Sequence, residues 1–521
     1  MKRVIGYFVS AAMVCSMLAE TGITALAEEA SADRYEYVAF AIGSDPGDLS
    51  PWDFKSGQKE YIYTIIYDYL FDYIDGEYVP CVAKGYTEVD DLHWDVEIFD
   101  YVHDYQGNPI TAQDIVFDYE NFVNSGYAMK YDVFESVEAL DDYTLRFTWA
   151  KPVTAVGALE FIFCNTPLYS QKAYEEGNFA TQPVGSGPYY VESYSSGSKV
   201  TCVANDNYWQ TEESLIPEKR ARNVQTIDFV VVGEASQNVV GLQNGNLDFS
   251  MFVPNENVAD FSDGGKNDEA FDVVSFMTHN TYYLALDNSE GAATADINLR
   301  KAIYYGIDNE ALATAVGSAV ACKAFGSNTS ADYVDAWEEE ENYINIYDPE
   351  LAKEYLEASS YNGETLILLA GNDETYKNAA TVIQAFLVNL GINCELSLQE
   401  EAQVTSNSTD PDAWDLYLAE CGGSFLVGAM NRTFNKDEYT GDYCIGFISD
   451  DELQELYEIA STEETWNDES VTNIFHHVVD NAYLYTLFCD QYNFVYTSDV
   501  EELYFWDIFI LPNACTYTTS N

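Results

Sequence analysis

The chain has 521 residues, 47% of them hydrophobic, and this length predicts two to four domains, each with a core of its own. An aromatic share of 15% excludes a disordered acidic polymer. Asp and Glu number 88 against 22 Lys and Arg, a formal net charge of −66, so the surface repels phosphate backbones and anionic headgroups and we expect no nucleic-acid partner.

The first predicted element is a secretory signal peptide over residues 1–27. Two basic residues precede a mostly apolar run at residues 4–19, and residues 25–27 (Ala-Leu-Ala) offer small side chains where a signal peptidase cleaves. We therefore expect cleavage before Glu28 and secretion across the cytoplasmic membrane of a bacterium.

Two alternatives to a cleaved signal peptide are less favoured. A retained membrane anchor is one, but the apolar run falls short of the roughly 20 residues that a bilayer requires. A lipid on Cys15 is the other, but Val14 stands where a lipoprotein signal normally has a small residue. We expect a protein without lipid, in the periplasm or at the cell surface.

After the signal peptide, strand-like and helix-like segments alternate, which predicts a mixed α/β protein. The expected strands of the first half are residues 37–42, 94–99, 144–149 and 227–232, and the expected helices are 60–71, a segment starting at 111, and 235–244. The loop after the first strand, residues 43–47, contains the Gly and Pro residues that stop regular structure.

The sequence becomes richer in helix beyond residue 286, where we place the main domain boundary. The expected elements are helices at 300–305, 351–359 and 376–390 and a strand at 394–398. Residues 492–496 and 505–511 are strand-like again, which predicts that the C-terminus returns to the sheet of the first domain.

Of the ten cysteines, nine remain after removal of the signal peptide. They are Cys81, Cys164, Cys202, Cys322, Cys394, Cys421, Cys444, Cys489 and Cys515. No two have the CxxC spacing of metal and redox motifs, and most have the apolar neighbours that are typical of buried thiols. We expect no structural disulfide framework, no metal site and no cofactor.

Several segments share the order and spacing of motifs from one protein family. Residues 183–191 read PVGSGPYYV and residues 205–209 read NDNYW, and further matches lie at 66–80, 109–117, 242–248 and 299–308. Together they resemble the signature of oligopeptide- and dipeptide-type solute-binding proteins of ABC transporters, solute-binding protein family 5. The resemblance extends from residue 35 to about residue 510.

The resemblance implies a two-lobed α/β fold of the periplasmic-binding-protein type (type II, cluster C), with an extra domain inserted in the first lobe. The implied limits are 33–60, 184–285 and 486–521 for the first lobe, 61–183 for the insert, and 286–485 for the second lobe. It also implies that a peptide or other small polar ligand binds between the lobes, and that hinge closure presents it to permease subunits. We expect a monomer.

The resemblance also implies where ligand binds. The expected ligand-binding residues are Ser44, Asp45, Tyr282, Tyr283, Glu420, Cys421 and Gly422. The loop at Ser44 and Asp45 aligns with backbone that meets extended peptides in the family. Tyr282 and Tyr283 lie at the crossover into the second lobe, where strand alternation sends only one of them toward ligand. Packing of both against the hinge strand is the alternative interpretation.

One departure from the family bears on ligand class. Peptide-binding members often hold the ligand's amino terminus with an Asp shortly after a Trp-Cys pair, and here Glu420 stands at the Trp and Gly423 at the Asp. Gly422 and Gly423 allow close approach to the backbone. We expect Glu420 or Asp45 to supply the cleft charge for a cationic ligand group instead.

Two alternative functions stay open. One is a binding protein of the same family for a non-peptide ligand, such as a sugar or a chelated metal. The other is a secreted hydrolase, but the sequence contains no HExxH or GxSxG motif, and the five histidines lack zinc-site spacing. Paired acids for glycoside hydrolysis stay compatible with so acidic a chain. We expect no enzymatic activity.

Overall fold

The computed structural model describes residues 34–51, 59–74, 77–125, 133–155, 157–251, 253–439, 441–506 and 509–518. The predicted signal peptide, with the alternative lipid site Cys15, lies outside these ranges. Within them, we find no helix that combines the length and apolar character needed to cross a bilayer.

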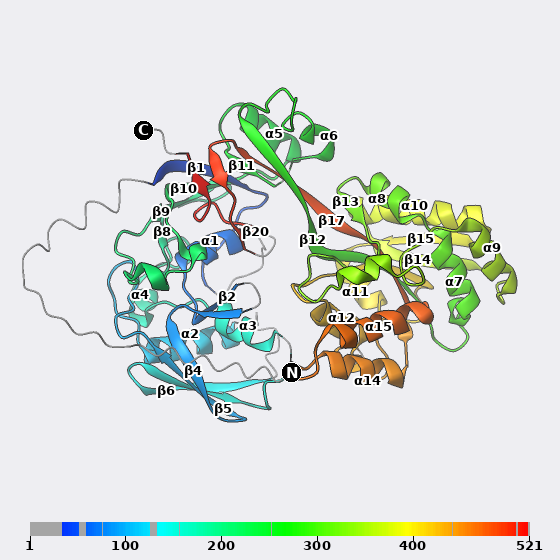
Figure 1. The fold of residues 1–521 in the computed structure, drawn as a ribbon, viewed down its shortest axis with the longest axis horizontal. Helices are drawn as coiled ribbons and strands as arrows, with labels where there is room; N and C mark the ends of the chain where they lie inside the picture. Colours follow the sequence, from blue (N-terminus) through cyan, green and yellow to red (C-terminus); the bar gives the residue numbers. More distant parts are fainter. Residues whose placement is uncertain are drawn as a thin grey trace, which may run out of the picture.

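An eleven-stranded mixed sheet runs through both lobes (Figure 1). Its strands lie in the order β15-β14-β16-β12-β17-β11-β1-β10-β9-β8, and β13 pairs with β17. The bounds are β1 Tyr35–Ile42, β8 Tyr189–Ser195, β9 Lys199–Ala204, β10 Val224–Val231, β11 Phe249–Ser250, β12 Phe271–Leu286, β13 Ala319–Ala321, β14 Thr365–Gly371, β15 Asn393–Gln399, β16 Leu416–Cys421 and β17 Leu484–Thr497.

The long strands β12 and β17 cross from the first lobe to the second (Figure 1). They pair antiparallel from Phe271 opposite Thr497 to Ala285 opposite Leu484. The register slips between Met277 and Thr281, so that three residues of β12 face the single residue Asp490 of β17. Such a bulge bends a strand pair locally, and it lies where the two lobes are joined.

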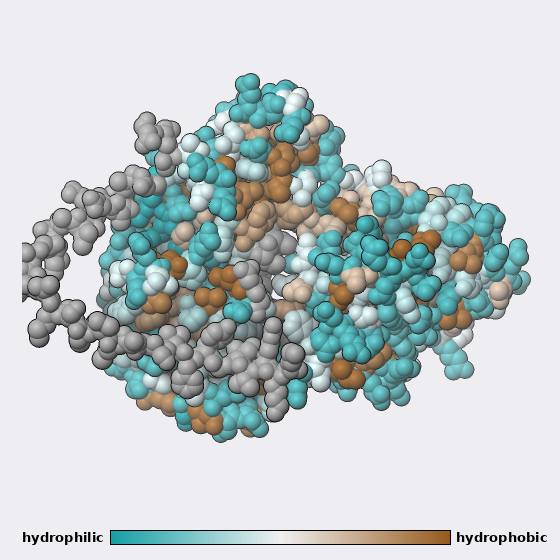
Figure 2. Space-filling model, viewed as in Figure 1, coloured by the Kyte–Doolittle hydropathy of each residue, from teal (hydrophilic) through white to brown (hydrophobic). Residues whose placement is uncertain are grey.

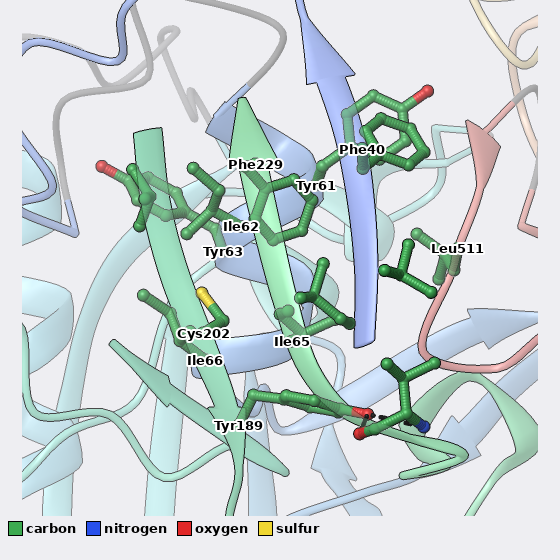
Figure 3. Close-up of a cluster of buried hydrophobic side chains, with 14 of the residues drawn as sticks. Phe40, Tyr61, Ile62, Tyr63, Ile65, Ile66, Tyr189, Cys202, Phe229 and Leu511 are labelled. Carbon is green, nitrogen blue, oxygen red and sulfur yellow. Dashed lines mark hydrogen bonds between the residues drawn. The ribbon is translucent and has the colours of Figure 1, made fainter. Parts of the chain in front are cut away.

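The first lobe buries one face of its sheet under helix α1 (Figure 3). Phe40 of β1 and Phe229 of β10 pack with Ile62 and Ile65 of α1 in one apolar cluster. The phenol of Tyr189 donates to the backbone oxygen of Val224, at 2.6 Å. The helix that packs on this sheet is α1 Lys59–Ile66, the other helices here are α5 Ala235–Gln243 and α6 Asn255–Val258, and 3₁₀ turns lie at Glu213–Leu215 and Glu218–Arg220.

The insert contains a four-stranded antiparallel sheet in the order β4-β5-β7-β6. Its elements are β2 Phe71–Ile74, β3 Glu77–Pro80, β4 Ala83–Asp90, β5 His93–Ile98, α2 Ala112–Asn124, β6 Phe134–Asp141, β7 Thr144–Trp149, α3 Ala158–Cys164 and α4 Gln171–Glu176. Alternate residues of β5 and β7, such as Trp94, Val96 and Phe147, share a core with Ile115 of α2.

In the second lobe, helices cover both faces of the sheet. They are α7 Ile297–Gly306, α8 Asn309–Val316, α9 Pro349–Ala358, α10 Glu374–Leu390, α11 Glu401–Asn407, α12 Leu426–Phe434, α13 Lys436–Tyr439, α14 Asp451–Ala460 and α15 Asp468–Asp480, with 3₁₀ turns at Ala293–Ala295, Asp335–Glu339 and Ile445–Phe447. Because strand residues alternate, Leu284 of β12 packs with Ile303 and Ile383 of α7 and α10, whereas Ala285 packs with Met430 and Phe475 of α12 and α15.

Most predicted elements are present, and the exceptions have physical causes. The strand 144–149 is confirmed, and the helices 235–244 and 376–390 are confirmed to within two residues at each end. The predicted helix 60–71 is wrong at its end, because α1 stops at Ile66. There the N–H of Gly187 donates to the Ile66 oxygen, and Arg220 donates to the oxygens of Thr64 and Tyr67, so the helix cannot continue.

The C-terminal segment returns to the first lobe only in part. Residues 492–496 lie in β17, which pairs with β11, as predicted. Residues 505–511 do not join that sheet, and the prediction that they do is wrong. They form a separate hairpin of β19 (Phe505–Trp506) and β20 (Phe509–Ile510), while β18 (Val500–Glu502) pairs with β21 (Thr516–Tyr517).

Candidate functional site

The carboxyl ends of parallel strands in both lobes lie near the place where β12 and β17 pass from one lobe to the other. In the second lobe β16 ends at Cys421, which pairs with Thr281 beside the bulge of β12. In the first lobe the parallel strands β1 and β10 end at Ile42 and Val231. Ligands of open α/β sheets bind beyond the carboxyl ends of such strands, so this region is the candidate site. Figure 2 shows the surface hollowed between the two lobes.

A small pocket of about 30 Å³ brings three of the predicted residues together. Tyr283 of β12 lines it with Cys421 and Gly422, next to Thr281 and Thr486. Its volume is roughly that of one or two water molecules. The pocket is therefore a niche in the wall of the second lobe rather than a chamber for a whole ligand.

Gly422 has a packing role beside this pocket. A Cβ atom on it would lie 2.7 Å from the side-chain oxygen of Asn280 and 2.8 Å from the backbone oxygen of His279. Only glycine lets the backbone after β16 pack this closely against the bulge of β12. The segment that carries Gly422 is thereby fixed to the joint between the lobes.

Tyr282 and Glu420 lie on the opposite face of the sheet from that pocket. Tyr282 is buried, stacks on Phe488 with ring centroids 4.5 Å apart, and meets Tyr376 edge-on at 5.4 Å. Glu420 pairs with Tyr282 across the two strands and is exposed. The structure thus turns the two predicted tyrosines to different faces, as strand alternation requires.

Asp490, opposite the bulge, makes this face acidic. Its pKa is raised to about 6, mainly by burial and also by the nearby Glu420 and Asp373 carboxylates, and a hydrogen bond from Asn280 opposes this rise. Burial and these acids also raise the pKa of the Tyr282 phenol, with Asp490 and Glu420 the main charges. The face presents concentrated negative charge beside the hinge.

Asp45, which we expect from the sequence to be a candidate for the cleft charge, is bonded to other parts of the first lobe. Its carboxylate accepts hydrogen bonds from the Tyr194 phenol, the Ser196 hydroxyl and the N–H groups of Gly47 and Gly197. Although burial raises its pKa, these hydrogen bonds hold it at about 2. Four donors occupy both oxygens, so Asp45 fixes its loop to the β8–β9 turn. Its neighbour Ser44 is exposed.

Arg432 of α12 is a candidate residue that sequence reasoning missed. Its Nε donates to the Cys421 thiol, 3.4 Å away, and its Nη2 donates to the backbone oxygen of Gly422. A Cβ on Gly423 would lie 3.7 Å from Nη2, so the position of the missing family acid faces a guanidinium. The signal was available: Arg432 is the only charged residue between positions 421 and 435.

A larger groove of about 410 Å³ lies on the first lobe, between the end of β10 and α5. Val231, Gly233, Glu234 and Gln237 are among the residues that line it. None of the predicted ligand-binding residues does.

The insert touches the second lobe near these groups. Tyr73 of β2 meets Phe425, just before α12, with ring centroids 6.1 Å apart. The N–H of Glu463 donates to the oxygen of Thr154 at 2.7 Å. The insert therefore contacts the second lobe independently of the hinge strands.

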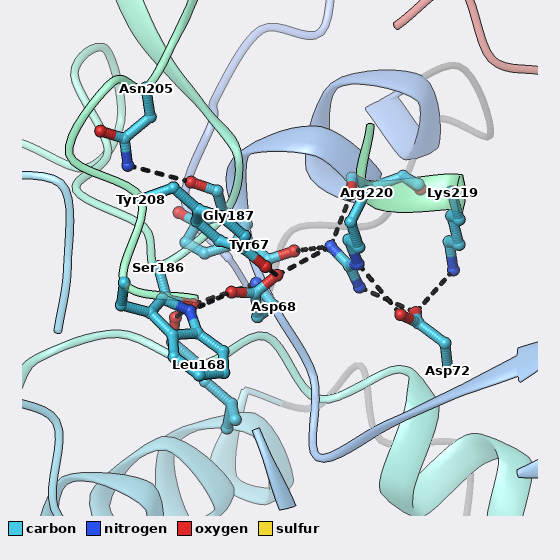
Figure 4. A network of polar contacts seen from close by, with 12 residues as sticks. Tyr67, Asp68, Asp72, Leu168, Ser186, Gly187, Asn205, Tyr208, Lys219 and Arg220 are labelled. Atoms are coloured by element: carbon cyan, nitrogen blue, oxygen red, sulfur yellow. Dashed lines mark hydrogen bonds and ion pairs between the residues drawn. The ribbon is translucent and has the colours of Figure 1, made fainter. Parts of the chain in front are cut away.

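The motif at residues 183–191 and 205–209 lies away from the hinge strands, where α1, the insert and the first lobe meet (Figure 4). Ser186 accepts from the N–H of Asp68 and donates to the oxygen of Leu168. The Asp68 carboxylate accepts from the Trp209 indole at 2.6 Å and the Tyr208 phenol at 3.2 Å. The motif thus supplies the partners of a buried acid.

Two acids and two bases form what we call the buried charge network: Asp68, Asp72, Lys219 and Arg220 (Figure 4). Arg220 lies 3.1 Å from Asp68 and 2.8 Å from Asp72, and Lys219 lies 3.0 Å from Asp72. Burial raises the pKa of Asp68 to about 6 despite Arg220. At Asp72 burial is outweighed by Arg220 and Lys219, which lower its pKa.

Metal binding has no support from clustering of ligands. Among the residues that the structure describes, no group of three or more His, Cys, Asp or Glu side chains is arranged to hold a metal ion.

The profile of the family described as "Bacterial extracellular solute-binding proteins, family 5 Middle" matches residues 77–435. The chain belongs to this family. Family 5 proteins bind solutes outside the cytoplasm and work with ABC permeases. The two-lobed mixed α/β fold found here is the family's fold.

The names of curated relatives of this family 5 protein state different ligands. It is 28% identical to heme-binding protein A of Haemophilus influenzae over 64% of this chain and 63% of that protein. It is 24% identical to the nickel-binding periplasmic protein of Escherichia coli, over 70% of this chain and 71% of that protein. The dipeptide-binding protein of Escherichia coli is also 24% identical, over 60% of this chain and 64% of that protein. The chain therefore spans just under two thirds of the first and third.

Solved structures agree in fold. HbpA2 of Haemophilus parasuis superposes with a TM-score of 0.78 at 16% identity, over 93% of this chain and all of that one. NikA of Brucella suis, in complex with Fe(III)-EDTA, superposes with a TM-score of 0.75 at 17% identity, over 92% and all of the respective chains. At these identities the likeness concerns the fold alone.

Proposed function

We propose that this chain captures an oligopeptide or dipeptide between its lobes, outside the cytoplasmic membrane, and delivers it to an ABC permease when the lobes close. The observation that carries the proposal is the position of the sheet ends. In the sheet, β16 and then β14 follow on one side of the β12–β17 pair, and β11, β1 and β10 follow on the other, so parallel strands of both lobes flank the two strands about which the lobes would close.

The charges at this place suit a ligand with both an ammonium and a carboxylate. Glu420 and Asp490 offer negative charge on one face of the sheet, and Arg432 offers a guanidinium on the other. A charge-assisted hydrogen bond in a closed cleft contributes about 1.5–3 kcal/mol. Asp45 is less suited to this role, because its oxygens already accept four hydrogen bonds.

A non-peptide ligand is the second candidate, because relatives are named for heme and nickel binding. A chelated metal would need no protein side chains on the ion itself. A hydrolase is less supported than either, and we expect the protein to bind its ligand without turning it over.

Native mass spectrometry of the purified protein tests the class of ligand. A retained peptide, released on denaturation and sequenced, would support the proposal. A retained haem, metal chelate or sugar would overturn the peptide assignment while leaving the receptor function intact. Peptides and glycosides incubated with the protein should be recovered unchanged, and sustained turnover that a change at the hinge abolishes would overturn the receptor function itself.

Calorimetric titration tests the acidic face. Glu420→Gln should weaken binding of the retained peptide about tenfold, which corresponds to about 1.4 kcal/mol. The matched control is Glu354→Gln, an exposed acid on α9 of the same lobe, which should bind as the parent does. Equal binding by parent and Glu420→Gln would mean that the ammonium is held elsewhere.

A further inference from the structure

Two thiols lie in contact at the second-lobe end of the hinge. Cys489 is in β17, and Cys322 directly follows β13, the short strand that pairs with β17. Their sulfur atoms are 3.3 Å apart, and the side chains are 0% and 5% exposed. The N–H of Cys322 donates to the oxygen of Leu487, which keeps the segment after β13 in register with β17.

We propose that Cys322 and Cys489 are a modification site, at which a small disulfide such as oxidised glutathione converts the two thiols into an intramolecular disulfide. The positions are diagonal neighbours on paired strands, a separation that side chains span readily. A disulfide has a sulfur–sulfur distance of about 2.05 Å, so the thiols must approach by little more than 1 Å. The nine cysteines that the structure describes are free, and this inference goes beyond the expectation of no structural disulfide framework and is independent of ligand class.

The exchange balances without a further oxidant. The Cys489 thiolate attacks one sulfur of oxidised glutathione, which gives a mixed disulfide and releases one reduced glutathione. Cys322 then attacks the Cys489 sulfur, which releases the second glutathione and closes the protein disulfide. Two protein thiols are oxidised, one glutathione disulfide is reduced, and the two protons pass to the two glutathione thiols.

The surroundings favour Cys489 as the first nucleophile. The thiol of Cys322 hydrogen-bonds to it and lowers its pKa, although burial opposes this. The Thr281 hydroxyl lies 3.5 Å from its sulfur. Two other buried cysteines bond to the backbone instead: the thiols of Cys444 and Cys515 donate to the oxygens of Ile448 and Leu511.

The reagent reaches the pair by local opening of β13. This strand has three residues, all half-buried, and β17 is its strand partner. Short strands held by few contacts open without global unfolding. Oxidation during folding after secretion reaches the same product, because oxidising compartments outside the cytoplasm sustain disulfides.

The bond would fix the second-lobe end of the hinge strand. It would close a loop between residues 167 positions apart, and constraint of the unfolded chain grows with loop length. Because Cys489 pairs with Thr281 where the bulge of β12 ends, the oxidised form would hold β13, β17 and the bulge together. We expect the melting temperature to rise by about 5 °C.

The test uses the protein comprising residues 28–521. After incubation with a glutathione redox mixture, it is denatured, alkylated and weighed. Seven of the nine thiols should be alkylated in the oxidised sample and all nine after reduction, and peptide mapping should join the Cys322 and Cys489 peptides. The melting temperature of the oxidised sample should exceed that of the reduced sample.

Three variants complete the test. Cys322→Ser and Cys489→Ser should each abolish the protected pair and the thermal shift, whereas Cys444→Ser, at another buried thiol, should keep both. Nine alkylated thiols in the oxidised parent, or a disulfide mapped to other cysteines, would overturn the proposal. Since the parent alone gives the map, the outcome does not depend on the folding of any variant.

Discussion

The buried charge network and the hinge region of the second lobe hold their charges in opposite ways. At the network, Asp68, Asp72, Lys219 and Arg220 are fully buried and paired with one another. At the hinge region, which we define as Glu420 to Gly423 with Arg432 and Asp490 on the two faces of the sheet, the guanidinium is bonded to a backbone oxygen and a thiol instead of an acid. Buried charges that are paired with opposite charges hold a structure together. A charge without an oppositely charged partner remains available to a ligand.

This contrast indicates that the family motif specifies the buried charge network and not the residues that would select a ligand. The motif residues Ser186, Tyr208 and Trp209 all bond to Asp68 or its backbone, in the buried network. None of them lines the pocket in the wall of the second lobe. Relatives can therefore share the motif and still bind heme, nickel or dipeptides, as their names state.

The strongest way to break the network is to remove its central cation. Arg220→Met leaves Asp72 and Asp68 buried with less compensation, so the free energy of unfolding should fall by about 3–5 kcal/mol. Thermal and denaturant unfolding measure the loss. Lys353→Met, which breaks an exposed pair with Glu350 on α9, should change stability by less than about 0.5 kcal/mol. Similar losses for both variants would contradict the stabilising role of the network.

The second prediction concerns the glycines of the motif. A Cβ on Gly185 would lie 1.9 Å from the backbone oxygen of Ile66, so Gly185→Ala must displace the end of α1. We expect a loss of about 2–3 kcal/mol. The matched control is Gly428→Ala in α12, where a Cβ meets nothing within 4 Å and should stabilise the helix by about 0.5–1 kcal/mol. Opposite signs for the two variants, measured by denaturant unfolding, would confirm the prediction.

The sequence predicts much of the fold because the signals that define it are local. The strand 144–149 alternates apolar residues, and the helix 376–390 ends at Gly391, whose φ of 102° suits glycine. The end of α1 was mispredicted because its carbonyls bond to Gly187 and Arg220, more than a hundred residues away. Local periodicity carries no information about such partners.

The candidate site was predictable only in outline, for the same reason. Alternation shows that Tyr282 and Tyr283 face opposite ways, but the pocket beside Tyr283 exists only once α12 is packed. The carboxylate of Asp45 is not free to bind ligand, because it accepts hydrogen bonds from Tyr194 and Ser196. No sequence spacing reveals these contacts. Arg432 was missed because it lies on the helix after the aligned segment, not within it.

The third prediction concerns how the stability contributed by Asp490 depends on pH. Asp490 has a pKa of about 6 in the folded chain, above its ordinary value near 4, so folding takes up a proton between pH 4 and pH 6. Its contribution to stability is fully present below about pH 4 and is lost as pH rises through 6. Asp490→Asn cannot ionise and should exceed the parent's stability by about 2 kcal/mol at pH 8.

Unfolding at pH 4.5 and pH 8 measures this difference. The variant and the parent should be nearly equal at the lower pH and separate at the higher one. Asp412→Asn, at an exposed acid of the same lobe, should show no such separation. A constant difference between Asp490→Asn and the parent at both pH values would mean that the surroundings of Asp490 do not raise its pKa.

The smallest expected effect is the most specific to ligand choice, and it rests on the peptide assignment. Arg432→Gln keeps donors for Cys421 and Gly422 but removes the positive charge beside Gly423. Affinity for a peptide with a free carboxylate should fall about tenfold, about 1.4 kcal/mol, whereas affinity for the corresponding peptide amide should stay unchanged. Lys436→Gln, which removes the half-buried partner of the exposed Asp451 two residues after α12, should affect neither ligand. Because stability should also stay within about 0.5 kcal/mol of the parent, a uniform loss for acid and amide would assign Arg432 to the packing of its loop and not to the ligand.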